Sequence, residues 1–488
     1  MQRPQVGLRS GVKPCTTWRQ RSASTRAEAP ALAPKFLHKP WVVVGVELGS
    51  ETSGLSVLEA ADESWLADFY STCRVQYAFS KCMRSFSSLW IMAKDTVRRT
   101  LTARALSVLL LALTFHVTAG AQVMSPSEIE ATIKDLAEPL VAKTRGSPQM
   151  VPGLVVGFTT EAGSGVLGFG TTRLRGGDEP GGGTFFGIGS ITKIFTGIIL
   201  AKAVVDGDVQ LDDSVNNYLK GDLRLDPSIS AQDLVTHSAG LPDFPANLAE
   251  FRDFDNDGRN DSVRDNPGRN YTRAQMAACL RGDCGRGGAV GAQSKYSNLG
   301  FGLLGIALQD RLGFADFDSM NREYITKPLG MHNTGLKSRR MRQKVFSRAA
   351  IGYDGSGGNL RPVPFPEMGA LASAGGLITT ADDMILLLRA LTGLDKTKLS
   401  SALTKAIQPL NRMGKDEIAY GIKVSRSASG ATLYSKGGAT AGFSSFIVWS
   451  RTPKVGFILM ANRGRYGKLQ KVGLDLANSA TSPGASAR

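Results

Sequence analysis

The apolar and polar positions beyond the first quarter of the chain predict strands near both ends and helices between them. The run from Ile194 to Val205 is apolar over a length typical of a buried helix. Segments 154–158 and 166–169 are short and apolar with glycine between them, which predicts a β-hairpin. Segments 445–449 and 455–460 flank a proline-containing turn and predict a second hairpin.

Further helices are expected before the first hairpin and after the second. Ser125 is a predicted N-cap, with proline at the next position and Glu128 closing a capping box, and this helix is expected to run to about Lys143. The last helix is predicted from Leu469 to Asn478. Strands at both ends and a polar, mainly helical middle predict an α+β fold with a helical lobe inserted into a sheet, and a cleft between the two.

Residues 92–121 have the pattern of a cleavable signal peptide. A basic segment precedes the apolar core 105–115, which is too short to span a membrane, and Ala119-Gly-Ala121 offers a cleavage site before Gln122. Because export signals are recognised at the N-terminus, we interpret residues 1–91 as an untranslated extension or, alternatively, as a poorly ordered leader. A periplasmic or secreted protein without a stable membrane span is expected.

The net charge of +16 is shared between this leader and the body of the chain. Residues 1–121 carry 15 basic and 8 acidic side chains, which leaves 43 basic and 34 acidic ones, or +9, for the rest. Such a body would attract an anionic cell-wall polymer, or it is simply a generic basic surface. No zinc-finger spacing or aromatic RNA-binding motif occurs, so nucleic-acid binding is not expected.

Three short motifs carry the candidate chemistry. Ser190 and Lys193 lie three residues apart at the start of the apolar helix, which places them on one face. A buried lysine whose charged form is disfavoured can take the proton of a serine hydroxyl and so activate it as a nucleophile. Tyr296-Ser297-Asn298 and Lys436-Gly437-Gly438 follow later in the chain. The S-x-x-K pattern also occurs at 10–13, and K-x-G also occurs at 471–473. The hypothesis therefore depends on the order and surroundings of the three motifs rather than on each motif alone.

The order S-x-x-K, Y-x-N and K-G-G resembles the serine β-lactamase and penicillin-binding DD-peptidase superfamily, in its class C β-lactamase-like branch. The resemblance covers roughly residues 150–465. It implies an antiparallel sheet flanked by helices with an inserted all-helical lobe. We expect the domain at 122–480, the helical lobe within it at roughly 207–345, and a tail at 481–488.

The resemblance also implies a role for each motif residue. Ser190 would be the acylated nucleophile, and Lys193 and Tyr296 would transfer protons, with either of them as the first acceptor. Three positions would bind the substrate: Asn298, Lys436 and Gly438. The backbone N–H groups of Ser190 and Ala439 would form the oxyanion hole. No cofactor is required for this chemistry.

The implied function is an exported serine hydrolase that works through an acyl-enzyme, of the D-alanyl-D-alanine carboxypeptidase/endopeptidase type. Its substrate would be a small peptide, a peptidoglycan fragment or a β-lactam. The alternatives are a class C-like β-lactamase, an esterase or D-amino-acid amidase, and a non-catalytic penicillin-binding sensor. Gly437 replaces the usual threonine, and no N-P-x-R segment follows Ala461-Asn462-Arg463, so the sequence favours a peptidase over a dedicated β-lactamase.

Residues 243–292 are longer than a compact link to the second motif requires. Within them, Cys279 and Cys284 are expected either to form a disulfide, as export would allow, or to remain free thiols. His237, just before this insertion, is expected to be a structural hydrogen-bonding residue rather than a catalytic base.

The same insertion contains an acidic run that resembles the opening of a calcium loop. Alternate carboxylates can converge on the ion because Gly258 permits the sharp turn. Arg264 stands where a closing glutamate is usual, so the segment is either a calcium site or a solvated loop. The possible ligands are Asp253, Asp255, Asp257 and Asp261, with Asp265 as a substitute for the last.

Overall fold

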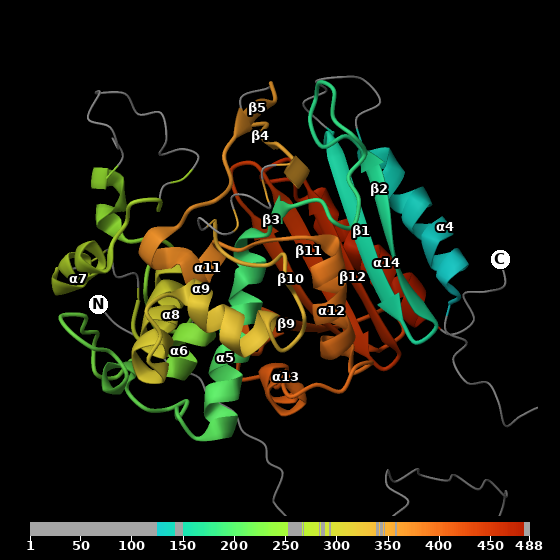
Figure 1. Cartoon of the computed structure of the whole chain (residues 1–488). Helices are drawn as coiled ribbons and strands as arrows, with labels where there is room; N and C mark the ends of the chain where they lie inside the picture. Colours follow the sequence, from blue (N-terminus) through green and yellow to red (C-terminus); the bar gives the residue numbers. More distant parts are fainter. Residues whose placement is uncertain are drawn as a thin grey trace, which may run out of the picture. The chain divides into compact units, whose positions relative to one another are not determined.

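The computed structural model (Figure 1) describes residues 124–482 except 142–149, 252–265, 267, 283, 285–287, 292–293, 338–340, 342–344, 346 and 357–358. The segments expected to be an extension (1–91) and a signal peptide (92–121) lie outside the described residues, as does the acidic run from Asp253 to Asp261. Among the residues that are described, no helix is both long and apolar enough to cross a membrane.

An eight-stranded sheet in which every neighbouring pair is antiparallel forms the centre of the fold, in the order β2-β1-β12-β11-β10-β9-β8-β7. Both predicted hairpins are confirmed, and they pair with each other through β1 and β12, with Leu154 opposite Ala461. The α+β prediction is therefore confirmed. The strands are β1 (Gly153–Thr160), β2 (Gly163–Gly170), β7 (Asn411–Met413), β8 (Asp416–Ile418), β9 (Lys423–Arg426), β10 (Thr432–Ala439), β11 (Ser444–Arg451) and β12 (Lys454–Ala461).

Helices cover both faces of this sheet because its central strands alternate between two apolar clusters. Phe446 and Val448 of β11 pack with α4 (Pro126–Ala137) and α14 (Lys468–Thr481), at the right in Figure 1. Ile447 and Trp449 of the same strand face the opposite way, into the larger cluster. That cluster includes α5 (Thr192–Asp206), α12 (Ala381–Thr392) and α13 (Ser400–Ala406). A sheet with both faces buried in this way is a rigid support for a site at its edge.

The helix predicted from Ser125 begins as expected but ends early. Ser125 Oγ accepts the Glu128 N–H and the Glu128 carboxylate accepts the Ser125 N–H, which confirms the capping box. The expected end near Lys143 is wrong: α4 stops at Ala137 and a 3₁₀ turn, Glu138–Leu140, follows. Pro139 explains the difference, because proline inside an α-helix lacks the N–H and clashes with the preceding turn.

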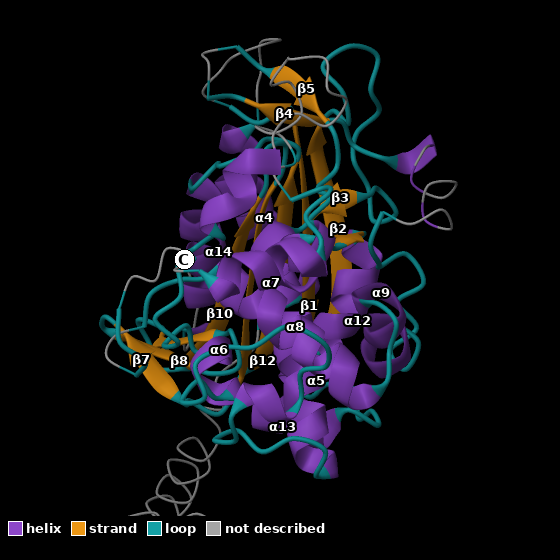
Figure 2. Cartoon of the chain, turned by 90° about the vertical axis from the view of Figure 1, so that its left-hand side faces the viewer, coloured by secondary structure: helices purple, strands orange, loops and turns teal. Residues whose placement is uncertain are grey.

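Helices on one side of the sheet form the middle region of the chain, as Figure 2 shows from that side. The longest, α8, packs on α5, α6 and α11. These helices are α6 (Ala231–Val235), α7 (Arg273–Arg281), α8 (Asn298–Leu312), α9 (Phe317–Asn321) and α11 (Ala372–Gly375). Two short sheets complete the fold: β3 (Phe186–Gly187) with β6 (Ile378–Thr379), and β4 (Gly352–Asp354) with β5 (Arg361–Val363).

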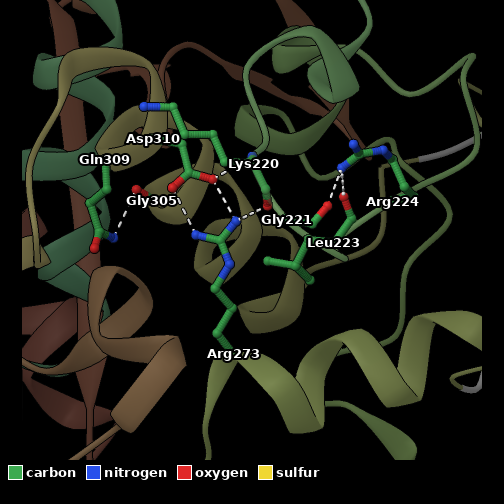
Figure 3. A network of polar contacts seen from close by, with 8 residues as sticks. All are labelled: Lys220, Gly221, Leu223, Arg224, Arg273, Gly305, Gln309 and Asp310. Carbon is green, nitrogen blue, oxygen red and sulfur yellow. Dashed lines mark hydrogen bonds and ion pairs between the residues drawn. The ribbon is translucent and has the colours of Figure 1, made fainter.

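An ion pair fastens α7 and the loop before α6 to the C-terminal half of α8 (Figure 3). Arg273 Nη1 and Nη2 donate to the two carboxylate oxygens of Asp310 at 2.7 and 2.6 Å. The same carboxylate accepts the Lys220 N–H at 2.7 Å, and Arg273 also donates to the Lys220 carbonyl. A bidentate pair fixes direction as well as distance. The network therefore holds α8 firmly at the end opposite to Asn298, the first residue of the helix.

Candidate active site

Ser190 lies at a sharp junction between β3 and α5. It occupies a 3₁₀ turn, Gly189–Ile191, and α5 begins only at Thr192, so the serine precedes the α-helix by one short turn. Gly189 has a φ of 48°, and a Cβ there would lie 2.7 Å from the Ala439 nitrogen. Only glycine fits, because the backbone is left-handed and β10 approaches it closely. This approach brings the backbones of the two expected oxyanion donors, Ser190 and Ala439, to the same place.

The first two motifs meet at the serine hydroxyl. Ser190 Oγ lies 2.5 Å from the Tyr296 hydroxyl and 3.2 Å from Lys193 Nζ. Lys193 Nζ also donates to Asn298 Oδ1 at 2.6 Å and to the Ala374 carbonyl at 2.7 Å. The serine is thus in hydrogen-bond contact with both groups predicted to transfer its proton.

The electrostatic surroundings favour an uncharged lysine and an uncharged tyrosine. Lys193 has no exposed surface. Burial, followed by the positive charge of Lys436, holds its pKa well below the usual 10.5, although Asp243 opposes the shift. Burial also raises the pKa of Tyr296, in spite of its hydrogen bond with Ser190. Both shifts favour the uncharged forms, and a neutral amine beside a neutral phenol suits transfer of the serine proton.

The hydrogen bonds of Lys193 give its lone pair a direction. A neutral amine has two N–H donors and one lone pair. When the two protons go to Asn298 Oδ1 and the Ala374 carbonyl, the lone pair is left for the Ser190 hydroxyl. Tyr296 can then donate its own proton to Ser190 Oγ, which the 2.5 Å contact allows.

Asp243 orients the Asn298 side chain that accepts from Lys193, and this residue was not identified from the sequence. Its Oδ1 accepts from Asn298 Nδ2 at 2.7 Å, and its carbonyl accepts the Asn298 N–H at 2.8 Å. These bonds orient the amide so that Oδ1 faces Lys193. The contact joins residues 55 positions apart, so no local pattern could have revealed it. The substrate-binding role expected for Asn298 stays a prediction.

The third motif forms a wall of the site from β10. Lys436 is the fifth of eight residues in this strand, and its Nζ lies 5.1 Å from the centre of the Tyr296 ring. Burial lowers the pKa of Lys436 to about 8. A Cβ on Gly438 would lie 2.0 Å from the Ile188 carbonyl oxygen, so glycine is required there. Gly437 is exposed, and the nearest atom to its Cβ position is 3.8 Å away.

β10 offers an unpaired edge beside Ser190. It pairs with β11 as far as Ala439, but β9 covers it only from Thr432 to Ser435. Residues 436–439 therefore face a cleft of about 730 Å³. The cleft is lined by six of the predicted catalytic and substrate-binding residues: Ser190, Tyr296, Asn298, Lys436, Gly438 and Ala439. Lys193 is buried and reaches the site through its contact with Ser190 Oγ. The lining also includes Phe244, Asn266, Met368, Met413, Asp416 and Lys423.

The remaining predicted sites have different outcomes. Cys279 and Cys284 are joined in a disulfide, the first of the two expected alternatives. His237 makes hydrogen bonds to the second motif, as expected of a structural residue. The described residues contain no group of three or more His, Cys, Asp or Glu that could hold a metal ion, and the four aspartates of the acidic run are not among them.

Comparisons with known proteins agree with this geometry. A family model described as Beta-lactamase matches residues 133–481, and the chain therefore belongs to the beta-lactamase family. A beta-lactamase of Pseudomonas fluorescens is 25% identical over 376 residues, covering 69% of this chain and 94% of that protein. The D-alanyl-D-alanine-carboxypeptidase/endopeptidase AmpH of Escherichia coli K12 is 29% identical over 171 residues, covering 34% of this chain and 40% of AmpH.

Solved structures show the same fold. A class C beta-lactamase superposes with a TM-score of 0.59 at 22% identity, covering 72% of this chain and 96% of that one. The octameric penicillin-binding protein homologue from Pyrococcus abyssi also gives 0.59 at 22% identity, covering 72% and 76%. The protein is a serine hydrolase of the β-lactamase and DD-peptidase type.

Proposed function

We propose that the protein is an exported D-alanyl-D-alanine carboxypeptidase/endopeptidase-type penicillin-binding protein that forms an acyl-enzyme at Ser190. The observation that carries this proposal is the continuous contact from Tyr296 through Ser190 Oγ to the buried Lys193. Ser190 and Tyr296 line a cleft that one unpaired strand edge also lines. A peptide can add to such an edge through main-chain hydrogen bonds.

Acylation follows from the directions of these hydrogen bonds. Neutral Lys193 accepts the Ser190 proton while Oγ attacks the scissile carbonyl carbon. Backbone N–H groups of Ser190 and Ala439 stabilise the oxyanion of the tetrahedral intermediate. The C–N bond then breaks and Tyr296 protonates the leaving amine. Transfer of the extra proton from Lys193 to the phenolate restores both groups, and water later hydrolyses the ester.

The charges around the cleft favour a substrate that carries a carboxylate. Lys436, Lys423 and Arg465 line it. The carboxylate of Asp416, also in the lining, is neutralised by Lys423 at 2.6 Å. An excess of positive charge in a partly enclosed cleft attracts anionic ligands. A C-terminal D-alanine carboxylate is the expected anion, in the field of Lys436.

Gly437 weakens the case for a dedicated β-lactamase, because the position lacks the hydroxyl that the family's usual threonine would place beside the substrate carboxylate. A class C-like β-lactamase is the second candidate. It is favoured by the relative of Pseudomonas fluorescens, which the match covers nearly end to end. The two candidates share acylation and differ in how fast water releases the acyl group.

Mass spectrometry of the purified protein distinguishes them. After mixing with penicillin, we expect an acyl-enzyme that persists. In a separate incubation without penicillin, we expect the enzyme to turn over a D-alanyl-D-alanine peptide. Rapid decay of the adduct with no peptide turnover would establish the β-lactamase. Export has its own test, because N-terminal sequencing of the exported protein should give a start near Gln122, and a start within residues 1–91 would contradict the signal assignment.

A further inference from the structure

His237 contacts the chain on both sides of Tyr296. Its carbonyl accepts the Lys295 N–H at 2.8 Å, and its Nδ1 accepts the Ser297 N–H at 3.1 Å. The residue has a φ of 62°, in the left-handed region that most side chains avoid but that His, Asn and Asp adopt more readily. A turn held in this uncommon conformation presents carbonyl and ring to the same short segment.

The imidazole also packs against the face of the tyrosine. Its ring centre lies 4.6 Å from that of Tyr296 and 5.0 Å from that of Phe301, and only 3% of His237 is exposed. The tyrosine ring thus rests on a buried support that is itself wedged against α8. Because Tyr296 Oη must stay 2.5 Å from Ser190 Oγ, a small rotation of the ring would break the contact.

The hydrogen bond at Nδ1 fixes the protonation state of this imidazole. An Nδ1 that accepts from Ser297 carries no proton, so the neutral ring has its proton on Nε2. A protonated imidazolium would also carry an N–H on Nδ1, and this donor would face the Ser297 N–H, so the hydrogen bond would be lost. Burial, followed by the positive charge of Lys436 of β10, holds the pKa of His237 well below its usual range, and a proton on Lys193 of α5 would lower it further.

We propose that His237 is the positioning residue for Tyr296, and that a neutral imidazole bonded to the Ser297 N–H fixes the phenol against Ser190 Oγ. This inference rests on the proposed role of Tyr296 in acylation. His237 touches neither the serine nor the substrate carbonyl in this account. Its effect is confined to the rate of the step in which Tyr296 takes part, and it leaves substrate affinity unchanged.

Three substitutions separate the parts of the contact. His237→Asn keeps an acceptor close to the Nδ1 position and tolerates the left-handed backbone. His237→Gln places its amide nearer the Nε2 position, and His237→Phe keeps only a ring, so both lose the acceptor. We expect the acylation rate with a fluorescent penicillin to fall about 10- to 100-fold for Gln and Phe, as for a small misplacement of a reacting group. His237→Asn should stay within about threefold, and half-saturation should not change for any of them.

A double-mutant cycle with Tyr296→Phe tests whether His237 acts through the tyrosine. In the Tyr296→Phe background, we expect His237→Gln and His237→Phe to cost less than about threefold. The same fold-loss in both backgrounds, or wild-type rates for both variants, would overturn the inference while leaving the proposed function intact. Wild-type acylation by Tyr296→Phe alone would contradict both proposals. Should His237→Phe fail to fold, the Gln and Asn variants complete the comparison.

Discussion

Substitution of Lys193 by methionine tests the protonation state on which the mechanism depends. Methionine has a similar length and no charge, so it fills the same buried space. It leaves Asn298 Oδ1 and the Ala374 carbonyl without their donor. Each unsatisfied acceptor costs about 1–3 kcal/mol, which the removal of a poorly solvated amine partly offsets. The variant should fold, and its acylation rate should fall about 100- to 10,000-fold, the range for loss of a general base.

The pH dependence of stability gives the quantitative test. Lys193 has a lower pKa in the folded state than in the unfolded chain, where 10.5 is usual. Between the folded-state pKa and about pH 10 the unfolded state therefore binds one more proton, and native stability rises with pH across that interval. The slope is about 1.4 kcal/mol per pH unit. If Lys193 is neutral at pH 7, as the mechanism requires, wild-type stability should gain about 2.7 kcal/mol relative to Lys193→Met between pH 7 and pH 9.

Urea unfolding of the two proteins at pH 7, 8 and 9 measures this difference. Titration of Lys436 and of every other group common to both largely cancels in the comparison. Parallel stability curves over this range would show that Lys193 is charged in the native state. In that case it could not be the first proton acceptor, and Tyr296 would have to take that role.

Three further results are expected. Gly438→Ala should cost about 1–3 kcal/mol of stability and slow acylation, because its Cβ would meet the Ile188 carbonyl at 2.0 Å. Gly437→Ala should be nearly neutral in thermal melts, because the nearest atom to its Cβ is 3.8 Å away, and equal losses for the two variants would contradict the packing argument. Because the pKa of Lys436 is about 8, the KM for a peptide carboxylate should rise as pH increases from 7 to 9, and Lys436→Arg should abolish that rise; a flat wild-type profile would refute it. A calcium ion held by the acidic run from Asp253 to Asp261 would make the melting temperature higher in millimolar calcium than in excess chelator. The increase should be small because Arg264 stands in place of the closing carboxylate, and identical melting curves would indicate a solvated loop.

Much of the fold was accessible from the sequence because its signals are local. The apolar hairpins, the capping box at Ser125 and the long apolar helix after Ser190 depend on neighbours in the chain. The early end of α4 was also accessible, since Pro139 marks it, and the predicted extension to Lys143 ignored that proline. The short strands β7 to β9 could not be predicted, because three or four residues carry too little periodicity to distinguish them from loops.

The candidate site divides in the same way. Ser190, Tyr296 and Lys436 could be found from motif order, since each motif keeps its own local spacing. The interior position of Lys436 in β10 was hidden, because the second half of the strand, Ser-Lys-Gly-Gly-Ala at 435–439, lacks apolar alternation. Asp243 could not be found, because its role arises only when the first residue of the insertion reaches the start of α8.

Peptide mapping of the penicillin adduct tests the central claim most directly. The account predicts a single covalent adduct, located by fragmentation on Ser190, that is absent from Ser190→Ala although this variant has the same circular dichroism and melting temperature. An adduct on any other residue, or undiminished labelling of the alanine variant, would contradict the assignment of Ser190 as the nucleophile.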